Sequence, residues 1–184
     1  FPVLTNPYLN IVQLKIHKLK IKSSSSKPIL IPFLTKHITT NKKINYTMLY
    51  KNDDLRKEKI IMNIIVLIDQ LLQKEANLNL LITTYNILPI DDQYGFIETI
   101  PHSVTLHQLK QFNCSIQNFI NEHNSHLSIH EIKQRFVSSC AAYCVITYLL
   151  GIGDRHLENI MITKSGVLFH IDYGFILGED PKKL

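Results

Sequence analysis

The sequence predicts an α+β fold in two parts, a strand-rich first part and a helical second part. Up to Ile100, most segments are short and alternate apolar with polar residues, as half-buried strands do. Turn-forming residues separate these segments. One long segment that begins at Asn52 instead repeats apolar residues at helical spacing. After Pro101 the helical pattern dominates, and a hairpin pattern follows it. The hydrophobic fraction of 45% indicates a folded chain, and 184 residues are enough for one sizeable core.

The first part should be a twisted sheet with one packed helix. Serines 23–26 and the run 40–43 are its clearest turns. The helix should begin after Asn52-Asp53-Asp54, because acids in a first turn interact favourably with the helix dipole, and it should run to about Lys74. We expect strands at Leu14–Ile21, Ile44–Lys51, Ile82–Leu88 and Gly95–Ile100, with an apolar stretch at Ile29–Leu34. The apolar face of the helix should include Ile60, Ile61, Ile64, Leu67, Ile68 and Leu71.

The second part should contain three helices, at Leu106–Phe112, Ser115–His123 and Ser128–Leu150. Ser128 with Glu131 three residues later is a capping box, which fixes the start of the third helix. The stretch 137–150 is apolar but only fourteen residues long, so it fits a buried helix and is too short to span a bilayer. Cys140 and Cys144, four residues apart, should be core thiols on this helix.

Charge and cysteine content suggest the class of partner and the compartment. A net charge of +5 and a pI near 9.0 suit an anionic partner such as a nucleotide or an acidic lipid headgroup. The basic residues are scattered over the first sixty positions, so nucleic-acid binding is only weakly indicated. No signal-peptide pattern opens the sequence, and three cysteines cannot pair off fully, so we expect a reducing, cytosolic compartment.

Residues 151–174, GIGDRHLENIMITKSGVLFHIDYG, carry the strongest chemical signal. The apolar runs 160–163 and 167–171 flank a Lys-Ser-Gly turn and predict a hairpin. Asn159 enters its first strand and Asp172 leaves its second, so both side chains can hold a divalent cation by oxygen. Asp154 is close enough to face a substrate hydroxyl, and Gly174 should let the backbone turn sharply behind Asp172. These are the parts that phosphoryl transfer needs, although a surface hairpin with charged loops would show some of them.

The order Asp154-Arg155-His156 inverts the His-Arg-Asp of protein kinases and resembles the phosphoinositide kinases and their protein-kinase relatives. Within that superfamily the sequence resembles the class III phosphatidylinositol 3-kinases, the vacuolar-sorting lipid kinases. The resemblance is dense from about Ser115 to Lys183, and it is patchy but colinear from Ser23 to Thr105. The segments that carry it are SIQNF at 115–119, YCVITY at 143–148, GDRHL at 153–157, TKSG at 163–166, ILG at 176–178 and DPK at 180–182.

The resemblance implies a two-lobed kinase-like fold with a β-rich N-lobe and a helical C-lobe. Residues 1–100 would form the N-lobe, with a hinge near 98–101. Residues 101–184 would form the first part of the C-lobe and end within the activation loop, so we expect the C-lobe to be incomplete.

The resemblance places ATP on the N-lobe. The phosphate loop would be Ser23, Ser24 and Ser25 with Lys27, although a serine run can also be a plain solvent turn. Lys51 would be the lysine on the α- and β-phosphates; one residue of the family spacing is missing after it, so either Lys51 or Tyr50 occupies that position. We favour Lys51, because a cation is needed there. Further ATP-site residues would be Glu58, the Tyr85 that meets it, the adenine-carrying segment with Glu98 and Ile100, and Met161 and Ile171, which could equally be plain core residues.

The resemblance also gives roles to the catalytic residues. His156 would accept the proton from the inositol hydroxyl, supported by Asp154, since histidine can take up a proton near neutral pH. Asn159 and Asp172 would bind Mg²⁺ or Mn²⁺. Arg155 would be structural, pairing a nearby carboxylate, and His170 would pack behind the loop. Lys182 would contact the headgroup phosphate, if it is not simply a solvated loop lysine; Glu179 departs from the basic residue usual in the family.

The implied activity is ATP-dependent phosphorylation of the 3-hydroxyl of phosphatidylinositol. The alternatives are a phosphatidylinositol 4-kinase or a related protein kinase and, in another class, a truncated, non-catalytic kinase-fold scaffold. The implied partners are phosphatidylinositol in a membrane surface, a regulatory protein-kinase-like subunit and a Beclin-like subunit. The implied location is cytoplasmic and peripheral on endosomal or autophagic membranes.

Overall fold

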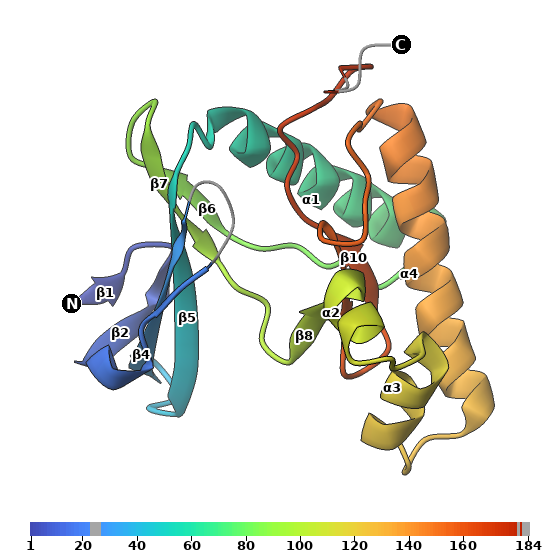
Figure 1. Cartoon of the computed structure of the whole chain (residues 1–184), viewed down its shortest axis with the longest axis horizontal. Coiled ribbons are helices and arrows are strands. Elements are labelled where there is room, and N and C mark those ends of the chain that lie inside the picture. Colours follow the sequence, from blue (N-terminus) through green and yellow to red (C-terminus); the bar gives the residue numbers. More distant parts are fainter. Residues whose placement is uncertain (23–26, 180, 182–184) are drawn as a thin grey trace. The chain divides into compact units, whose positions relative to one another are not determined.

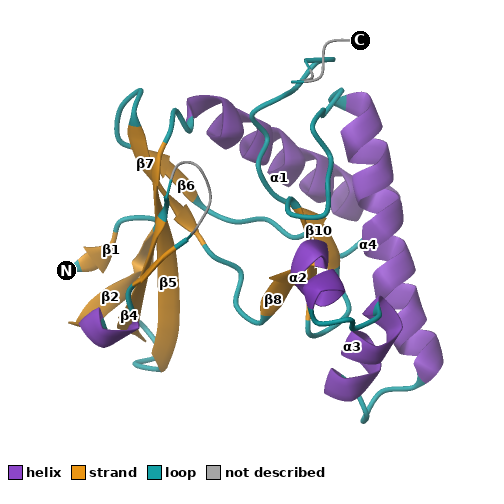
Figure 2. Ribbon diagram, viewed as in Figure 1, coloured by secondary structure: helices purple, strands orange, loops and turns teal. Residues whose placement is uncertain are grey.

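The protein is described from a computed structural model, which covers residues 1–22, 27–179 and 181. The predicted site residues Ser23, Ser24, Ser25 and Lys182 lie outside these described residues. The chain divides into two compact units, Phe1–Met62 with Tyr85–Pro101 (unit 1) and Asn63–Thr84 with His102–Leu184 (unit 2). Unit 1 is mostly sheet and unit 2 mostly helix, so the predicted α+β class is confirmed (Figures 1 and 2).

Unit 1 is built on one antiparallel sheet in the order β1-β2-β4-β5-β7-β6, with β3 pairing β4. Its longest ladder joins β4 and β5, from Ile29↔Tyr50 to Lys36↔Lys43. Its buried core comprises Val3, Leu9, Phe33, Tyr46 and Met48, which alternate along the strands with more exposed residues. The strands are β1 (Pro2–Val3), β2 (Asn6–Leu14), β3 (Lys20–Ile21), β4 (Ile29–His37), β5 (Lys43–Asn52), β6 (Ile87–Pro89) and β7 (Tyr94–Glu98).

Two of the predicted strands are wrong in part. The segment predicted as one strand at 14–21 is the end of β2, a 3₁₀ turn, η1 (Ile16–Lys18), and the short β3. The turn bonds from Lys18 N to Lys15 O (2.9 Å) and from Leu19 N to Ile16 O (3.1 Å) interrupt the ladder there. The strand predicted at 82–88 begins only at Ile87, because backbone groups before it bond to side chains: Thr83 O accepts from Tyr143 Oη at 2.7 Å and Asn86 N donates to Glu98 Oε2 at 3.0 Å.

Helix α1 (Arg56–Ala76) has the predicted length and contributes residues to both units. Its most buried residues are Ile61, Met62 and Ile65, with Leu55 just before the helix. The predicted apolar face is therefore wrong in part, since Ile60, Leu67 and Leu71 are at least half exposed. Apolar residues occupy more of this helix than one buried face can cover, so their positions alone did not select the buried face.

Unit 2 holds a three-stranded sheet in the order β10-β9-β8 and three further helices. The predicted helices are confirmed with small shifts at their ends. The capping box at Ser128 is confirmed too: Ser128 Oγ accepts the N–H of Glu131 at 3.2 Å, and Glu131 accepts the N–H of Ser128 at 2.9 Å. The elements are β8 (Ser103–Thr105), α2 (Leu106–Gln111), α3 (Ile116–His123), α4 (Ile129–Leu149), β9 (Ile160–Thr163) and β10 (Leu168–His170).

Helix α4 is only half buried, contrary to the prediction. Tyr143 and Ile146 are almost fully enclosed, whereas Val145 and Tyr148 on another side are 57% and 86% exposed. Cys144 is exposed, so the prediction of a core thiol is wrong there. Within the described part of the chain, no helix is both long and apolar enough to cross a membrane.

Candidate active site

The predicted hairpin is present and brings the candidate metal ligands to one end. Strands β9 and β10 pair from Leu168↔Ile162 to His170↔Ile160, and Gly166 takes the turn with φ 83°. Beyond the last pair, Ile171 N donates to Asn159 O at 3.0 Å. Asn159 and Asp172 therefore leave the same open end of the hairpin, one from each strand.

The amide of Asn159 fixes the loop that precedes it. This side chain is buried, with 4% exposed. Its Oδ1 accepts the N–H of His156 at 3.0 Å, and its Nδ2 donates to the carbonyl of Asp154 at 2.7 Å. Both ends of the amide are thus used to hold the Asp-Arg-His turn, in which Asp154 is left-handed (φ 52°). Aspartate tolerates this conformation better than most residues, but the arrangement still needs such external support.

His156 and Asp154 face each other across this turn. His156 Nε2 lies 3.7 Å from Asp154 Oδ2, and Nδ1 accepts the N–H of Glu158 at 3.2 Å. His156 Nε2 also lies 3.3 Å from the amide nitrogen Nδ2 of Asn159. Because an amide nitrogen can only donate, Nε2 can accept from Asn159 when it is unprotonated and can face Asp154 when it carries a proton. The geometry therefore couples the two candidate proton acceptors.

Arg155 joins the catalytic turn to the segment after the hairpin. Its guanidinium donates to the carbonyls of Gly153 (2.8 Å), Ile171 (2.9 Å) and Asp172. It also lies 5.9 Å from the ring centroid of Tyr173, within reach of a cation–π contact. Sequence reasoning gave Arg155 a carboxylate partner and missed these carbonyls, because backbone acceptors leave no signal in residue identities.

The sharp turn at the metal-ligand position is made by Asp172 itself, with φ 62°. Gly174, which we predicted to take it, does not have a positive φ. The Arg155 bonds on either side of this turn, to the carbonyls of Ile171 and Asp172, compensate for the unfavourable backbone conformation.

The two functional loops run side by side. Gly153 N donates to Phe175 O at 3.0 Å, Leu177 N to Leu150 O at 2.9 Å, and Gly178 N to Gly151 O at 3.0 Å. Gly151 is required at this approach, because an added Cβ would lie 2.8 Å from the nitrogen of Gly178 and its φ is 53°.

In unit 1, the residues predicted to meet ATP form two close pairs. Lys51, on β5, has only 14% of its side chain exposed, and its Nζ lies 2.8 Å from Asp53 Oδ2. Glu58, on α1, is 5% exposed and accepts a hydrogen bond from the hydroxyl of Tyr85 at 3.1 Å. The contact predicted between Tyr85 and Glu58 is therefore present.

Residues 45–184 match the family described as phosphatidylinositol 3- and 4-kinase. The chain belongs to the phosphatidylinositol 3- and 4-kinase family. Over 98% of its length it is 35% identical to phosphatidylinositol 3-kinase pik3 of Schizosaccharomyces pombe. Over 89% it is 41% identical to phosphatidylinositol 3-kinase VPS34 of Saccharomyces cerevisiae, and over 88% it is 39% identical to the root isoform of phosphatidylinositol 3-kinase from Glycine max. These matches cover 18–23% of the relatives, so the chain spans about a fifth of their length.

Glu98 and its neighbours form the segment that we assign to adenine in this family member. Some of the backbone N–H groups of this segment already form hydrogen bonds within unit 1. Glu98 N donates to Asn86 O at 2.8 Å and Thr99 N to Thr47 O at 3.1 Å, while the Glu98 carboxylate accepts from Asn86 Nδ2 at 2.7 Å. Contacts from these two residues to a purine would therefore use their carbonyl groups. Of the remaining candidates, Met161 and Ile171 are half-buried in unit 2, and Lys27 is exposed with φ 43°.

Behind the Asp-Arg-His turn lies a buried polar group. His170 Nδ1 is 3.3 Å from Thr147 Oγ1, its ring lies 4.9 Å from that of Tyr143, and its carbonyl accepts from Tyr173 Oη at 2.9 Å. Burial, helped by the charge of Arg155, lowers the pKa of His170 to about 4, so the ring is neutral at physiological pH. The packing role predicted for His170 is confirmed; its partners on α4 lay within an apolar helical pattern and could not be singled out.

The donor set fits a magnesium-type cation. Asp172 offers a carboxylate oxygen, and the amide oxygen of Asn159, which accepts the N–H of His156, has a second lone pair for a cation. Mg²⁺ often takes only one or two protein ligands beside water and phosphate oxygens. Across the described residues, no group of three or more His, Cys, Asp or Glu side chains is arranged to hold a metal ion. A site completed by nucleotide phosphates is consistent with both observations.

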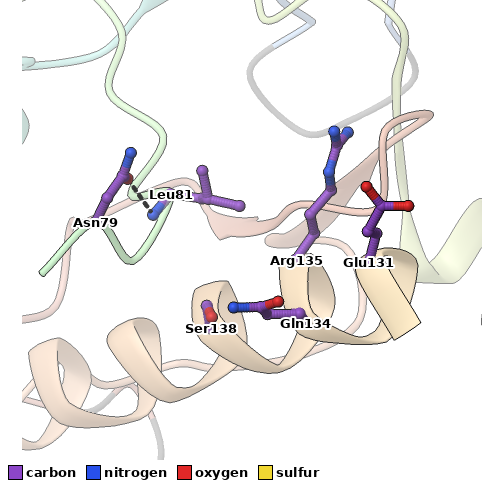
Figure 3. A pocket seen from close by; sticks show the side chains of 6 residues that line it. All are labelled: Asn79, Leu81, Glu131, Gln134, Arg135 and Ser138. Atoms are coloured by element: carbon purple, nitrogen blue, oxygen red, sulfur yellow. Dashed lines mark hydrogen bonds between the residues drawn. The ribbon is translucent and has the colours of Figure 1, made fainter. Parts of the chain in front are cut away.

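A pocket of about 240 Å³ in unit 2 does not belong to this site. It is formed by α4 and the segment before Tyr85, and none of the predicted site residues lines it (Figure 3). Glu131, at its rim, is already used to cap α4. The lining residues are Asn79, Leu81, Glu131, Gln134, Arg135 and Ser138.

Proposed function

We propose that this chain is part of the catalytic domain of an ATP-dependent lipid kinase. The enzyme phosphorylates the 3-hydroxyl of phosphatidylinositol to give phosphatidylinositol 3-phosphate. The convergence of Asn159 and Asp172 at one end of the hairpin, beside the Asp154–His156 pair, carries the proposal. Phosphoryl transfer depends mainly on positioning and charge neutralisation, and this group offers cation ligands and proton acceptors together. Identity to proteins named phosphatidylinositol 3-kinase supports the choice of substrate.

The residues of unit 2 divide the chemistry between them. Asn159 and Asp172 hold the divalent cation, Mg²⁺ or Mn²⁺, which when bound neutralises charge on the nucleotide phosphates. His156 accepts the proton of the lipid hydroxyl, with Asp154 stabilising the charged ring that results. Arg155 holds the backbone of both loops in register.

The residues of unit 1 are assigned to ATP. Lys51 exchanges Asp53 for the α- and β-phosphates, as a cation on a flexible stem can do. Glu58, held by the hydroxyl of Tyr85, helps to orient the groups around Lys51. Glu98 and Ile100 present their backbone groups to adenine. Ser23, Ser24 and Ser25 with Lys27 complete the phosphate contacts, and Met161 with Ile171 closes the adenine slot. In this proposal, residues 1–100 act as the N-lobe and residues 101–184 as part of the C-lobe.

The proposed substrate lies in a membrane, so the proposed location is peripheral, on endosomal or autophagic membranes. By analogy with the class III enzymes, the proposed protein partners are a protein-kinase-like regulatory subunit and a Beclin-like subunit. Lys182 is assigned to the headgroup phosphate. One or two lysines can neutralise a phosphodiester, whereas each added monoester brings up to two more charges that need their own donors.

Lipid-kinase assays with the full chain on phosphatidylinositol, its 4-phosphate and its 4,5-bisphosphate test the proposal, with the position of the new phosphate read by chromatography. We expect phosphatidylinositol 3-phosphate from the first substrate and little turnover of the bisphosphate. A 4-phosphate product would identify a phosphatidylinositol 4-kinase, and peptide phosphorylation alone would identify a protein kinase. Failure to bind ATP or to transfer phosphate would favour a non-catalytic scaffold.

A further inference from the structure

Positive charge is concentrated in the first 52 residues of the chain. They contain nine lysines and neither aspartate nor glutamate. The whole chain has 20 basic and 15 acidic residues. Residues 53–184 therefore hold eleven basic and all fifteen acidic residues and are net acidic. The overall charge of +5 therefore conceals a strongly basic first segment, and such asymmetry indicates an extended anionic partner.

Part of this segment forms the edge of the unit 1 sheet. We define the basic edge as residues 12–21, which comprise the end of β2, the turn η1 and β3. Strand β4 pairs with β5 from Ile29 to Lys36, so β2 and β3 both lie along its other side. Among the described pairings, β1 meets β2 only at Asn6 and Asn10 and so stops before the basic edge. Figure 1 shows β2 and β4 adjacent in the blue part of the chain.

The basic edge exposes large apolar side chains between its lysines. Lys18, Lys20 and His17 are also exposed, whereas Lys15 is half-buried and donates to Asn45 Oδ1 at 2.6 Å. Apolar side chains of this size are normally gathered into a core, whereas this ten-residue segment exposes five of them beside exposed lysines. The exposed fractions are 51% for Val12, 40% for Leu14, 68% for Ile16, 40% for Leu19 and 70% for Ile21.

We propose that the basic edge is a docking surface for an anionic lipid bilayer. This inference rests on the proposed function in one respect, since a lipid kinase must work at a membrane. Lysines are attracted to acidic headgroups, and aliphatic side chains beside them enter the boundary between headgroups and acyl chains. Nucleic acid would use the lysines through its phosphates and would leave five aliphatic side chains in water. The interleaving of both residue types therefore favours the bilayer.

Vesicle co-sedimentation of the full chain, without ATP, tests the proposal. We expect binding to phosphatidylcholine vesicles that contain a quarter phosphatidylserine, weaker binding at higher salt, and little binding to pure phosphatidylcholine. Lys18→Gln with Lys20→Gln should weaken binding roughly 25-fold, at about fivefold for each lysine. Ile16→Ser with Leu19→Ser should weaken binding to the same vesicles by about tenfold or more, because buried methylene groups are lost.

Matched pairs elsewhere on the surface serve as controls. Lys110→Gln with Lys133→Gln removes two other exposed lysines, and Leu71→Ser with Val137→Ser removes two other exposed apolar side chains. These pairs should leave vesicle binding within about twofold of the parent, given the small effect of isolated surface positions. Melting temperatures verify folding, and the single variants Lys18→Gln and Ile16→Ser replace any double variant that unfolds.

Unchanged vesicle binding in both edge variants would overturn the proposal, as would equal binding to neutral vesicles. Tighter binding of a DNA oligonucleotide than of acidic vesicles, lost in the lysine variant but not in the apolar one, would identify a nucleic-acid surface instead. Asp172→Asn separates the two proposals, because it should abolish phosphorylation and leave vesicle binding unchanged. Vesicle binding through the basic edge without any lipid phosphorylation would thus refute the function and retain the surface.

Discussion

The catalytic loops of unit 2 and the proposed ATP contacts of unit 1 are held in different ways. In unit 2, side chains within 24 consecutive residues are joined by hydrogen bonds to backbone atoms, so Asn159 and Arg155 shape the loops as well as line them. In unit 1, Lys51, Glu58 and Tyr85 come from a strand, a helix and a loop and meet other side chains. A substitution at Asn159 or Arg155 should therefore disturb the backbone of the loops, whereas one at Lys51, Glu58 or Tyr85 should mainly disturb a pair of side chains.

The largest expected effect is that of Asp172→Ala. It removes one of only two protein oxygens assigned to the cation and replaces a residue that tolerates φ 62° with one that does so less readily. We expect turnover to fall by at least about 100-fold, measured as lipid phosphorylation across a series of Mg²⁺ concentrations.

Glu158→Ala is the matched control, since it removes an exposed carboxylate from the neighbouring loop. Its contact with His107, at 3.7 Å, lies on the surface and should matter little. Equal activity of the two variants would remove Asp172 from the mechanism.

Arg155→Met should have the next largest effect. It removes three donor contacts to the carbonyls of both loops while keeping an apolar stem. Because the loops can relax after the change, we expect a loss of transition-state stabilisation equal to about one charge-assisted hydrogen bond, about 1.5–3 kcal/mol, and so a fall in turnover of about 10- to 100-fold. Amide hydrogen exchange at 171–175 should speed up as well, which tests the effect on loop geometry independently of activity.

Arg135→Met, on α4, should leave both measurements unchanged. If Arg155→Met reduced turnover but left hydrogen exchange at 171–175 as slow as in the parent, the residue would act through its charge and not by holding the loops.

Lys51→Met should act mainly on ATP. The lysine side chain is paired with the Asp53 carboxylate at 2.8 Å, and we assign it to the nucleotide phosphates, so its removal should raise the KM for ATP about tenfold. Lys43→Met, at an exposed position on the same strand, is the control. Similar small effects from both would mean that the missing residue after Lys51 has displaced the phosphate lysine, and the scaffold alternative would gain support.

The same contrast explains what could be predicted from the sequence. The hairpin, the helix boundaries in unit 2 and the capping box at Ser128 follow from short-range patterns, and the structure has them. The left-handed turn was misplaced by two residues, at Gly174 instead of Asp172, because aspartate can adopt it when Arg155 holds the neighbouring carbonyls. Such support comes from the fold and is not encoded in local propensity.

Errors in the rest of the fold share a physical origin. The apolar residues of α1 and α4 outnumber the positions that one buried face can hold, so periodicity alone did not show that Ile60 and Val145 are exposed. The strand predicted across η1 failed because a 3₁₀ turn interrupts an otherwise alternating pattern. The basic edge was also missed, although the absence of acidic residues before Asp53 was readable, because the net charge was considered mainly over the whole chain.

The smallest effect should come from Tyr85→Phe, which tests the side-chain pair of unit 1. The substitution removes the hydroxyl that donates to Glu58 Oε1 at 3.1 Å and leaves a buried carboxylate with one donor fewer. We expect the free energy of unfolding to fall by about 1–2 kcal/mol, measured by urea denaturation. Tyr148→Phe, at a position 86% exposed on α4, should change it by less than about 0.5 kcal/mol. Tyr85 and its partner Glu58 both belong to unit 1, so hydrogen exchange at 171–175 in unit 2 should stay as in the parent. Faster exchange there would show that the side-chain pair of unit 1 also supports the loops of unit 2, and the contrast between the two regions would fail.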